Sequence, residues 1–321
     1  MKKTLLIIFL SLATLGALAA PAKPSAAKSR KITVEKPDFK LIERVTHDPS
    51  SEFYYPKLIT AFNRNDTSMT KEQYRNLYLG YLFQEDYDPY RSSPYNAKSD
   101  SVLTLVTALN GRIKTVTDSL NRLVKANTIS GHEAELQKGR LETLYKRELR
   151  ELSTLVELSL KDNPFDLRQM SVLVHASKEM GNNMKAKIWE YRLENLLGAI
   201  KSTGTGENMD NAFYVIYPMH EYNMIQLLGY EPTAVDFPAE GFDYISVRPE
   251  EGSKRRIKNP SEGFYFNVVN MSEQYELKHP GEDDDATLQV QGTDDFIDPD
   301  DVPALDSDDE EAIDPDEIPA E

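Results

Sequence analysis

The clearest apolar periodicity of the chain runs from Ser99 to Asn127, which reads SDSVLTLVTALNGRIKTVTDSLNRLVKAN. Its apolar residues are spaced alternately three and four positions apart, which is the heptad pattern of a helix with one buried seam. The members of this seam are Val106, Leu109, Ile113, Val116, Leu120 and Leu123. After a break at Thr128 to Gly131, the pattern predicts a second striped helix that ends near Asp162. We expect an antiparallel hairpin in which each helix is the other's partner, with a coiled-coil dimer as the alternative.

Further helices are predicted on both sides of this hairpin. Pro56 suits the first turn of a short helix, and Thr70 begins a capping box that opens the next one. Beyond the hairpin, residues 165–180 and 184–200 form two amphipathic helices joined by a tight turn, similar to one tetratricopeptide unit. Residues 39–203 are therefore expected to form a helical domain.

The character of the sequence changes after the glycine-containing turn at residues 204–206. Runs of β-branched and aromatic residues, bounded by Gly, Pro or Asn, then indicate strands. These runs are residues 213–217, 242–247 and 263–269. Residues 222–230 fit either a short helix or a buried strand. The fold class is thus α+β, with a mainly helical N-terminal part and a small β-rich part at residues 204–279.

The N-terminus has the form of a secretory signal peptide, predicted to be residues 1–19. A basic start at Met1–Lys3 is followed by an apolar run, and Ala17-Leu18-Ala19 has the small-x-small pattern of a cleavage site. The run is about fifteen residues long, shorter than the roughly twenty of a permanent membrane span. The chain has no cysteine, which rules out a lipoprotein anchor and disulfides. We expect a periplasmic or secreted protein without a permanent membrane span.

The net charge of −16 comes from the end of the chain. Glu282 to Glu321 contain eighteen Asp and Glu and no Lys or Arg, whereas the chain between residues 19 and 282 has 35 of each sign. We expect a disordered linker at residues 20–38 and a disordered acidic tail at residues 280–321. The tail holds one motif twice: Ile297-Asp298-Pro299-Asp300 and Ile313-Asp314-Pro315-Asp316. This repeat is either a docking motif, with a basic partner as one possibility, or a duplication without function.

Charge and motifs disfavour several classes of function. A body without net positive charge is not expected to bind nucleic acid. The turn at residues 204–206 lacks the third glycine of a dinucleotide fingerprint, and His220-Glu221 lacks the second histidine of a metalloprotease. We therefore predict no cofactor and no metal. The alternative is a zinc site built from His175, His220 and a carboxylate such as Glu221.

The best candidate for a binding site lies where the second helix ends. Its tyrosines, with neighbouring polar groups, would form a flat surface rich in hydrogen-bonding atoms, as in protein interfaces and sugar-binding faces. Its members are Tyr81, Gln84, Asp86, Tyr87, Tyr90 and Arg91. The alternative is that these tyrosines pack the helix end against its neighbours, with hydroxyls bonded to Asp86 or Asp88. A second candidate segment is His220-Glu221-Tyr222.

Several stretches together resemble one family. They include YYPKL at residues 54–58, DTSMT at residues 66–70, LYLGYLFQEDYDPYR at residues 77–91, NPFDL at residues 163–167 and HEY at residues 220–222. They are similar to a family of exported proteins from Bacteroidota that is known only as a domain of unknown function. The resemblance covers about Leu41 to Val269 and implies no activity. Residues 110–138 depart from it as an extension of the hairpin, and the acidic repeat tail is a second departure.

Two functions remain open at this point. The helical pairs and the aromatic surface candidates favour a non-catalytic module that binds a protein or peptide partner in the cell envelope. The alternative is a hydrolase that acts on envelope or glycan material with carboxylates such as Asp86, Glu221 and Asp243, because carboxylate-pair chemistry needs a spacing rather than a motif.

Overall fold

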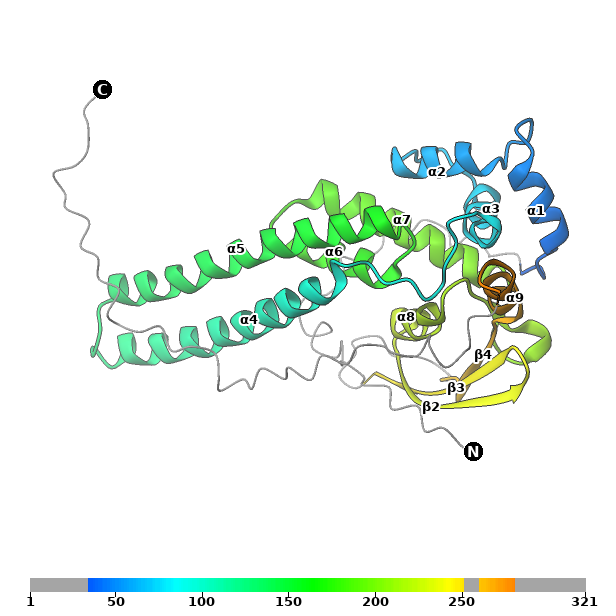
Figure 1. Cartoon of the computed structure of the whole chain (residues 1–321). Helices are drawn as coiled ribbons and strands as arrows, with labels where there is room; N and C mark the ends of the chain where they lie inside the picture. The colour runs from blue at the N-terminus through cyan, green and yellow to red at the C-terminus, as the bar shows by residue number, and fades with distance from the viewer. Residues whose placement is uncertain (1–33, 251–259, 281–321) are drawn as a thin grey trace, which may run out of the picture.

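The computed structural model describes residues 34–250 and 260–280 (Figure 1). The predicted signal peptide, most of the predicted linker and the acidic tail with its repeat lie outside the described residues. Within them, no helix is long and apolar enough to cross a bilayer.

The described residues begin with helices and end with a small layer of strands and helices. The first helices are α1 (Phe39–His47), α2 (Tyr55–Asn63), α3 (Lys71–Gly80) with the 3-10 turn η2 (Tyr81–Phe83), α4 (Asn96–Lys125), α5 (Gly131–Asp162), α6 (Leu167–Glu179) and α7 (Asn183–Lys201). They are followed by η3 (Met209–Asn211), β1 (Phe213–Tyr214), α8 (Pro218–Leu228), β2 (Tyr230–Ala239), β3 (Phe242–Pro249), β4 (Gly263–Asn267) and α9 (Val269–Lys278). The predicted α+β class is confirmed.

Side chains at the helix starts explain where the helices begin. The hydroxyl of Thr70 accepts from the backbone N–H of Gln73, while the Gln73 side chain accepts from the backbone N–H of Thr70, so the predicted capping box is confirmed. Ser130 caps α5 in the same position by accepting from the backbone N–H of Glu133. Each cap satisfies N–H groups that have no partner inside the helix.

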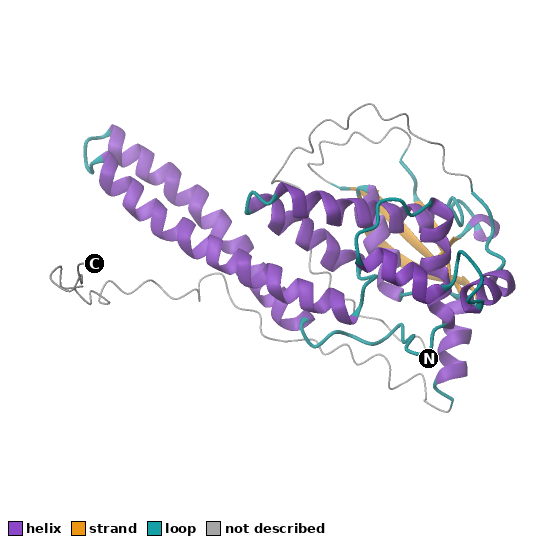
Figure 2. Cartoon of the chain, turned by 90° about the horizontal axis from the view of Figure 1, so that it is seen from above, coloured by secondary structure: helices purple, strands orange, loops and turns teal. Residues whose placement is uncertain are grey.

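The helices α4 and α5 form the predicted antiparallel hairpin, which we call the arm (residues 96–162). Figures 1 and 2 show the arm projecting well beyond α6 and α7, which lie beside its base. The seam is well buried near the base, at Val106 and Leu109, but Ile113 is only half-buried and Leu123 is 40% exposed. The seam is therefore less completely buried towards the tip, although Leu120 and Ala134 remain buried there.

The β-rich part is a four-stranded sheet in the order β1-β4-β3-β2. The strand β1 is parallel to β4, and the other neighbours are antiparallel. The strand predicted at residues 213–217 is only Phe213–Tyr214, because its partner β4 ends at Asn267, opposite Tyr214. The ambiguous segment at residues 222–230 is mainly helical, as part of α8.

Three regular elements were not predicted: the helix α1, the strand β2 and the helix α9. The strand β2 contains Pro232 and Pro238, which a central strand excludes but an edge strand paired only with β3 accepts. The helix α9 follows β4, and only its residues Met271 and Tyr275 are buried, too few to produce an apolar stripe in the sequence. Most of its surface is polar, so its position depends on packing rather than on pattern.

The helical and β-rich parts share one continuous core. Tyr78, Tyr87 and Phe165 are almost completely buried between them. The Tyr87 hydroxyl donates to the Ile216 carbonyl oxygen at 2.7 Å, and the Ile216 N–H donates to the Tyr78 hydroxyl at 3.3 Å. The residues that enter α8 are therefore fixed directly against α3 and the turn that follows it.

Candidate functional site

The predicted binding segment begins at a close contact between helices. A side chain at Gly80 would bring its Cβ within 2.6 Å of Thr46 Cγ2, so the glycine allows α1 to lie directly against α3. The chain then turns through η2, and the carboxylate of Asp88 accepts from the backbone N–H groups of Tyr90 and Arg91. This Asx turn is a local contribution to the path of the segment. The Lys278 ammonium of α9 adds a distant one by donating to the carbonyl oxygens of Leu82 and Gln84.

Burial of two tyrosines corrects the prediction of an exposed aromatic surface. Tyr81 is 6% exposed and Tyr87 is 1% exposed. Their rings meet edge to face at 5.5 Å, and the Tyr81 ring also stacks on Tyr55 at 6.1 Å. Burial raises the pKa of Tyr81 to about 12. The packing alternative describes these two residues, although the hydroxyl of Tyr87 bonds to Ile216 rather than to a nearby aspartate.

The members of the predicted segment do not form one continuous surface. Tyr81, Asp86 and Arg91 line a small recess, with room for about one water molecule. Its other lining residues are Asp88, Ser93, Asp162, Asn163 and Tyr217. Gln84 instead donates back to the Gly80 carbonyl at 3.1 Å, and Tyr90 packs edge to face on Tyr275 at 4.8 Å while remaining 40% exposed.

His220 is a buried structural group. Its Nε2–H donates to the Phe165 carbonyl oxygen at 3.0 Å, and its Nδ1 accepts from the Tyr78 hydroxyl at 2.7 Å. Burial lowers the pKa of His220 to about 3, so the ring is neutral. Both nitrogens are therefore engaged, which leaves no lone pair for zinc. No three potential metal ligands gather anywhere in residues 34–250 and 260–280.

Glu221 and Asp243 form a carboxyl pair that the sequence could not reveal. Glu221 lies in the first turn of α8 and Asp243 on β3, and a hydrogen bond joins their side chains. Burial, and then the charge of Asp243, raise the pKa of Glu221, while burial raises the pKa of Asp243. The two carboxyls therefore share a proton. Tyr222 lies beside them, and burial raises its pKa to about 12.

Access to this pair is limited. Glu221 is 3% exposed, and its Oε1 has no hydrogen-bond partner among the residues that the structure describes. Asp86 belongs to the separate recess near Tyr81 and Arg91. Two of the three carboxylates that sequence analysis considered for hydrolysis thus come together, and the third does not join them.

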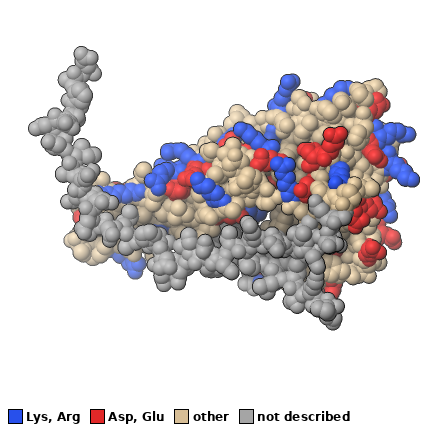
Figure 3. Space-filling view, viewed as in Figure 1, with Lys and Arg blue, Asp and Glu red and all other residues tan. Residues whose placement is uncertain are grey.

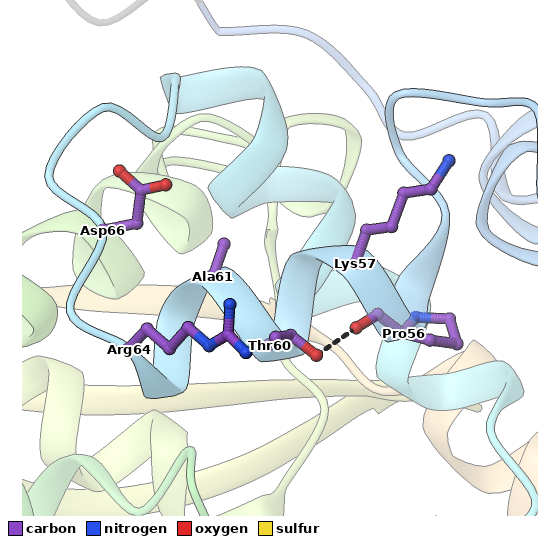
Figure 4. Close-up of a pocket in the computed structure, with 6 residues that line it drawn as sticks. All are labelled: Pro56, Lys57, Thr60, Ala61, Arg64 and Asp66. Atoms are coloured by element: carbon purple, nitrogen blue, oxygen red, sulfur yellow. Dashed lines mark hydrogen bonds between the residues drawn. The ribbon is translucent and has the colours of Figure 1, made fainter.

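A further concave surface, which no sequence motif indicated, lies along α2. It is an open groove with a volume of about 390 Å³, lined by Pro56, Lys57, Thr60, Ala61, Arg64 and Asp66 (Figure 4). Figure 4 shows Asp66 on the loop above Ala61, and the Thr60 hydroxyl donating to the Pro56 carbonyl oxygen at 2.6 Å. Lys57 is held at the rim because its ammonium donates to the Pro49 carbonyl oxygen at 2.6 Å. The groove therefore combines two cations, Lys57 and Arg64, with the carboxylate of Asp66.

Comparison with known proteins identifies a family for this chain but no individual relative. No curated protein and no solved structure matches this chain. A family model described as a domain of unknown function matches residues 40–130 and 118–277, which together cover well over half of the chain. The two matched segments overlap at residues 118–130, in the distal part of the arm. The chain therefore belongs to the DUF4919 family of domains of unknown function.

Proposed function

We propose that this protein is an exported, non-catalytic interaction module that binds a protein or peptide partner in the cell envelope, and that the arm carries the contact. The observation behind this proposal is the projection of the arm beyond every other described element (Figures 1 and 2). At 1.5 Å per residue, the 30 residues of α4 are about 45 Å long.

The arm contributes little to the core in its distal part. Ile113 and Val116 are only half-buried, Leu136 is 56% exposed, and Gly111 has open space where a side chain would stand. Ordering each of these residues costs about 1–2 kcal/mol of backbone entropy, which shallow burial offsets poorly. A long and weakly buried hairpin presents surface to a partner better than it stabilises the fold.

The test compares the mature chain, residues 20–321, with a trimmed-arm variant in which a short Gly-Ser turn replaces residues 113–142. This cut keeps Tyr145, whose hydroxyl donates to Glu179 at 3.1 Å, so the base of the arm stays attached to α6. Both proteins are used to capture proteins from envelope extract, after circular dichroism shows that both are folded. We expect the trimmed-arm variant to lose the partner. Retention of the same partner by both proteins would contradict the proposal.

One observation favours a second candidate, hydrolysis of envelope or glycan material. A carboxyl pair with raised pKa values, such as the buried Glu221 and the half-buried Asp243, is one arrangement that supports acid and base catalysis. Glu221 would need to become accessible, because its side chain is shielded in the described structure. If envelope glycan is cleaved by the native chain and not by Glu221→Gln or Asp243→Asn, this second function replaces the first.

A further inference from the structure

The outward face of α5 carries a regular basic stripe. Five residues spaced four, three, four and three positions apart lie on this face: Leu136, Arg140, Thr143, Arg147 and Arg150, which we call the outer stripe. This spacing aligns side chains along one side of a helix. All five are exposed, and the opposite side of α5, with Leu141 and Leu149, is buried. Figure 3 shows Lys and Arg side chains along the edge of the arm that α5 forms.

The charges of the outer stripe are incompletely matched. Within the described residues, Arg147 pairs with Glu148 at 2.8 Å, while Arg140 and Arg150 have no carboxylate within ion-pair distance. Guanidinium groups bind carboxylates through paired, directional hydrogen bonds. Leu136, at the tip end of the stripe, adds an exposed apolar contact. The surface thus fits an acidic peptide that also carries aliphatic residues.

The chain itself contains such a peptide. Residues 282–321 hold eighteen carboxylates, no Lys or Arg, and the motif Ile-Asp-Pro-Asp twice, at residues 297–300 and 313–316. In both copies an Ile stands next to carboxylates and a Val or Ile follows within five residues. The pairing of aliphatic and acidic groups in the motif matches the pairing of leucine and arginine on the outer stripe.

The length of the tail is sufficient for this contact. The described structure ends at Pro280, directly after α9. The 33 residues from there to the second motif can span on the order of 110 Å when extended, whereas α5 is about 48 Å long. A tethered ligand of this kind has an effective concentration in the millimolar range, so even weak contacts are occupied.

We infer that the outer stripe of α5 binds the chain's own acidic tail, and that the tail competes there with the envelope partner. This inference rests on the proposed function of the arm. Because the contact is electrostatic and exposed, salt weakens it. A partner with higher affinity for the arm displaces the tail. A ligand that binds the arm weakly does not, so the tail excludes non-specific ligands.

The experiment uses the mature chain with two engineered cysteines, Gln137→Cys on the arm and Ala320→Cys after the second motif, labelled as a donor and acceptor pair for energy transfer. The natural chain has no cysteine, so labelling is specific. The test variant is R140Q/R147Q/R150Q. The matched control is K114Q/R122Q/K125Q, which removes three exposed cations of α4 that lie off the outer stripe. We expect efficient transfer that falls severalfold in the test variant and, with about 0.5 M salt, in the native sequence, but persists in the control.

Each other outcome overturns the inference in a distinct way. Equal transfer in the test variant and the control would show that the stripe does not hold the tail. Transfer that appears only when donor-labelled and acceptor-labelled chains are mixed would assign the tail to a second copy. Neither result affects the proposed function, because loss of the partner by the trimmed-arm variant is measured separately. Partner binding that disappears with the arm while transfer stays insensitive to the stripe would sustain the first proposal and reject this one.

Discussion

The body and the arm of this protein are built from the same kind of helix but differ in how deeply their side chains are buried and in which contacts hold them. In the body, Tyr78 and Phe165 are fully buried, and tyrosine hydroxyls bond to groups far away in sequence. In the arm, each helix has mainly its neighbour as partner, and the seam is exposed at Leu123. Stability is therefore concentrated in the body, while the arm adds surface. Because the arm contributes less to stability than the body, we expect the arm rather than the body to carry the function.

The largest expected effect separates the two regions through core truncation. Phe165→Ala removes a ring that packs against Phe62 and Tyr81, and it should lower the free energy of unfolding by about 3–5 kcal/mol. Leu120→Ala, a buried seam residue of the distal arm, should cost about 2 kcal/mol or less, because the hairpin can collapse around the gap. Denaturant unfolding of both variants measures the contrast. Equal losses of unfolding free energy would show that the distal arm is packed as tightly as the body.

A second prediction concerns acid and the body. The pKa of His220 is lowered to about 3 by burial, below the ordinary value of 6.5. The stabilisation by the neutral ring is therefore complete above pH 6.5 and is lost as the pH falls towards 3, by up to about 1.4 kcal/mol per pH unit. Unfolding free energies measured between pH 4 and 7 should show this slope, and His220→Gln should flatten it. An unchanged slope in that variant would assign the acid sensitivity to other groups.

The neighbouring residue should act in the opposite direction. The pKa of Glu221 is raised by burial and by Asp243, so its contribution to stability is complete below pH 4.5 and declines as the pH rises above that value. Glu221→Gln keeps a donor for Asp243 and removes the ionisation, so it should raise stability by about 1 kcal/mol at pH 8. The measurement is thermal unfolding at pH 5 and pH 8. Destabilisation at both values would show that the shared proton supports the fold.

The smallest effect tests how loosely the arm is built. Gly111 and Gly139 lie in helix interiors with open space at the position of a Cβ, so Gly111→Ala and Gly139→Ala should each stabilise by about 0.5–1 kcal/mol. The matched control is Gly80→Ala in the body, which should destabilise because its Cβ would meet Thr46. Hydrogen exchange resolves the arm from the body. If either arm substitution destabilised the protein, the arm would be more tightly packed around that glycine than we describe.

The helical part could be predicted because its signals are local. The heptad spacing of α4 and the capping box at Thr70 act over a few residues. The capping box appears as predicted, and the predicted helix forms, although only Val106, Leu109 and Leu120 of its seam are buried. The edge strand β2 and the helix α9 could not, because prolines and polar residues conceal elements that are fixed by their neighbours. Sequence patterns indicate the local conformational preference of a segment. The conformations of β2 and α9 are instead set by the elements that pack against them.

The candidate site shows the same limit. The sequence identified Tyr81, Tyr87 and His220 as notable residues, and all three have defined roles in the structure. Their exposure could not be read from the sequence, because the partner of Tyr87 is Ile216, 129 positions away, and that of His220 is Tyr78, 142 positions away. The meeting of Glu221 with Asp243 and the concave face of α2 depend in the same way on how elements pack.

The most direct test of the central claim measures body and arm in one experiment. The trimmed-arm variant is followed by hydrogen exchange, to read the core around Tyr78 and Tyr87, and by capture from envelope extract, to read the partner. We predict unchanged protection of that core together with loss of the partner. Retention of the partner by a variant whose core is equally protected would contradict the assignment of binding to the arm.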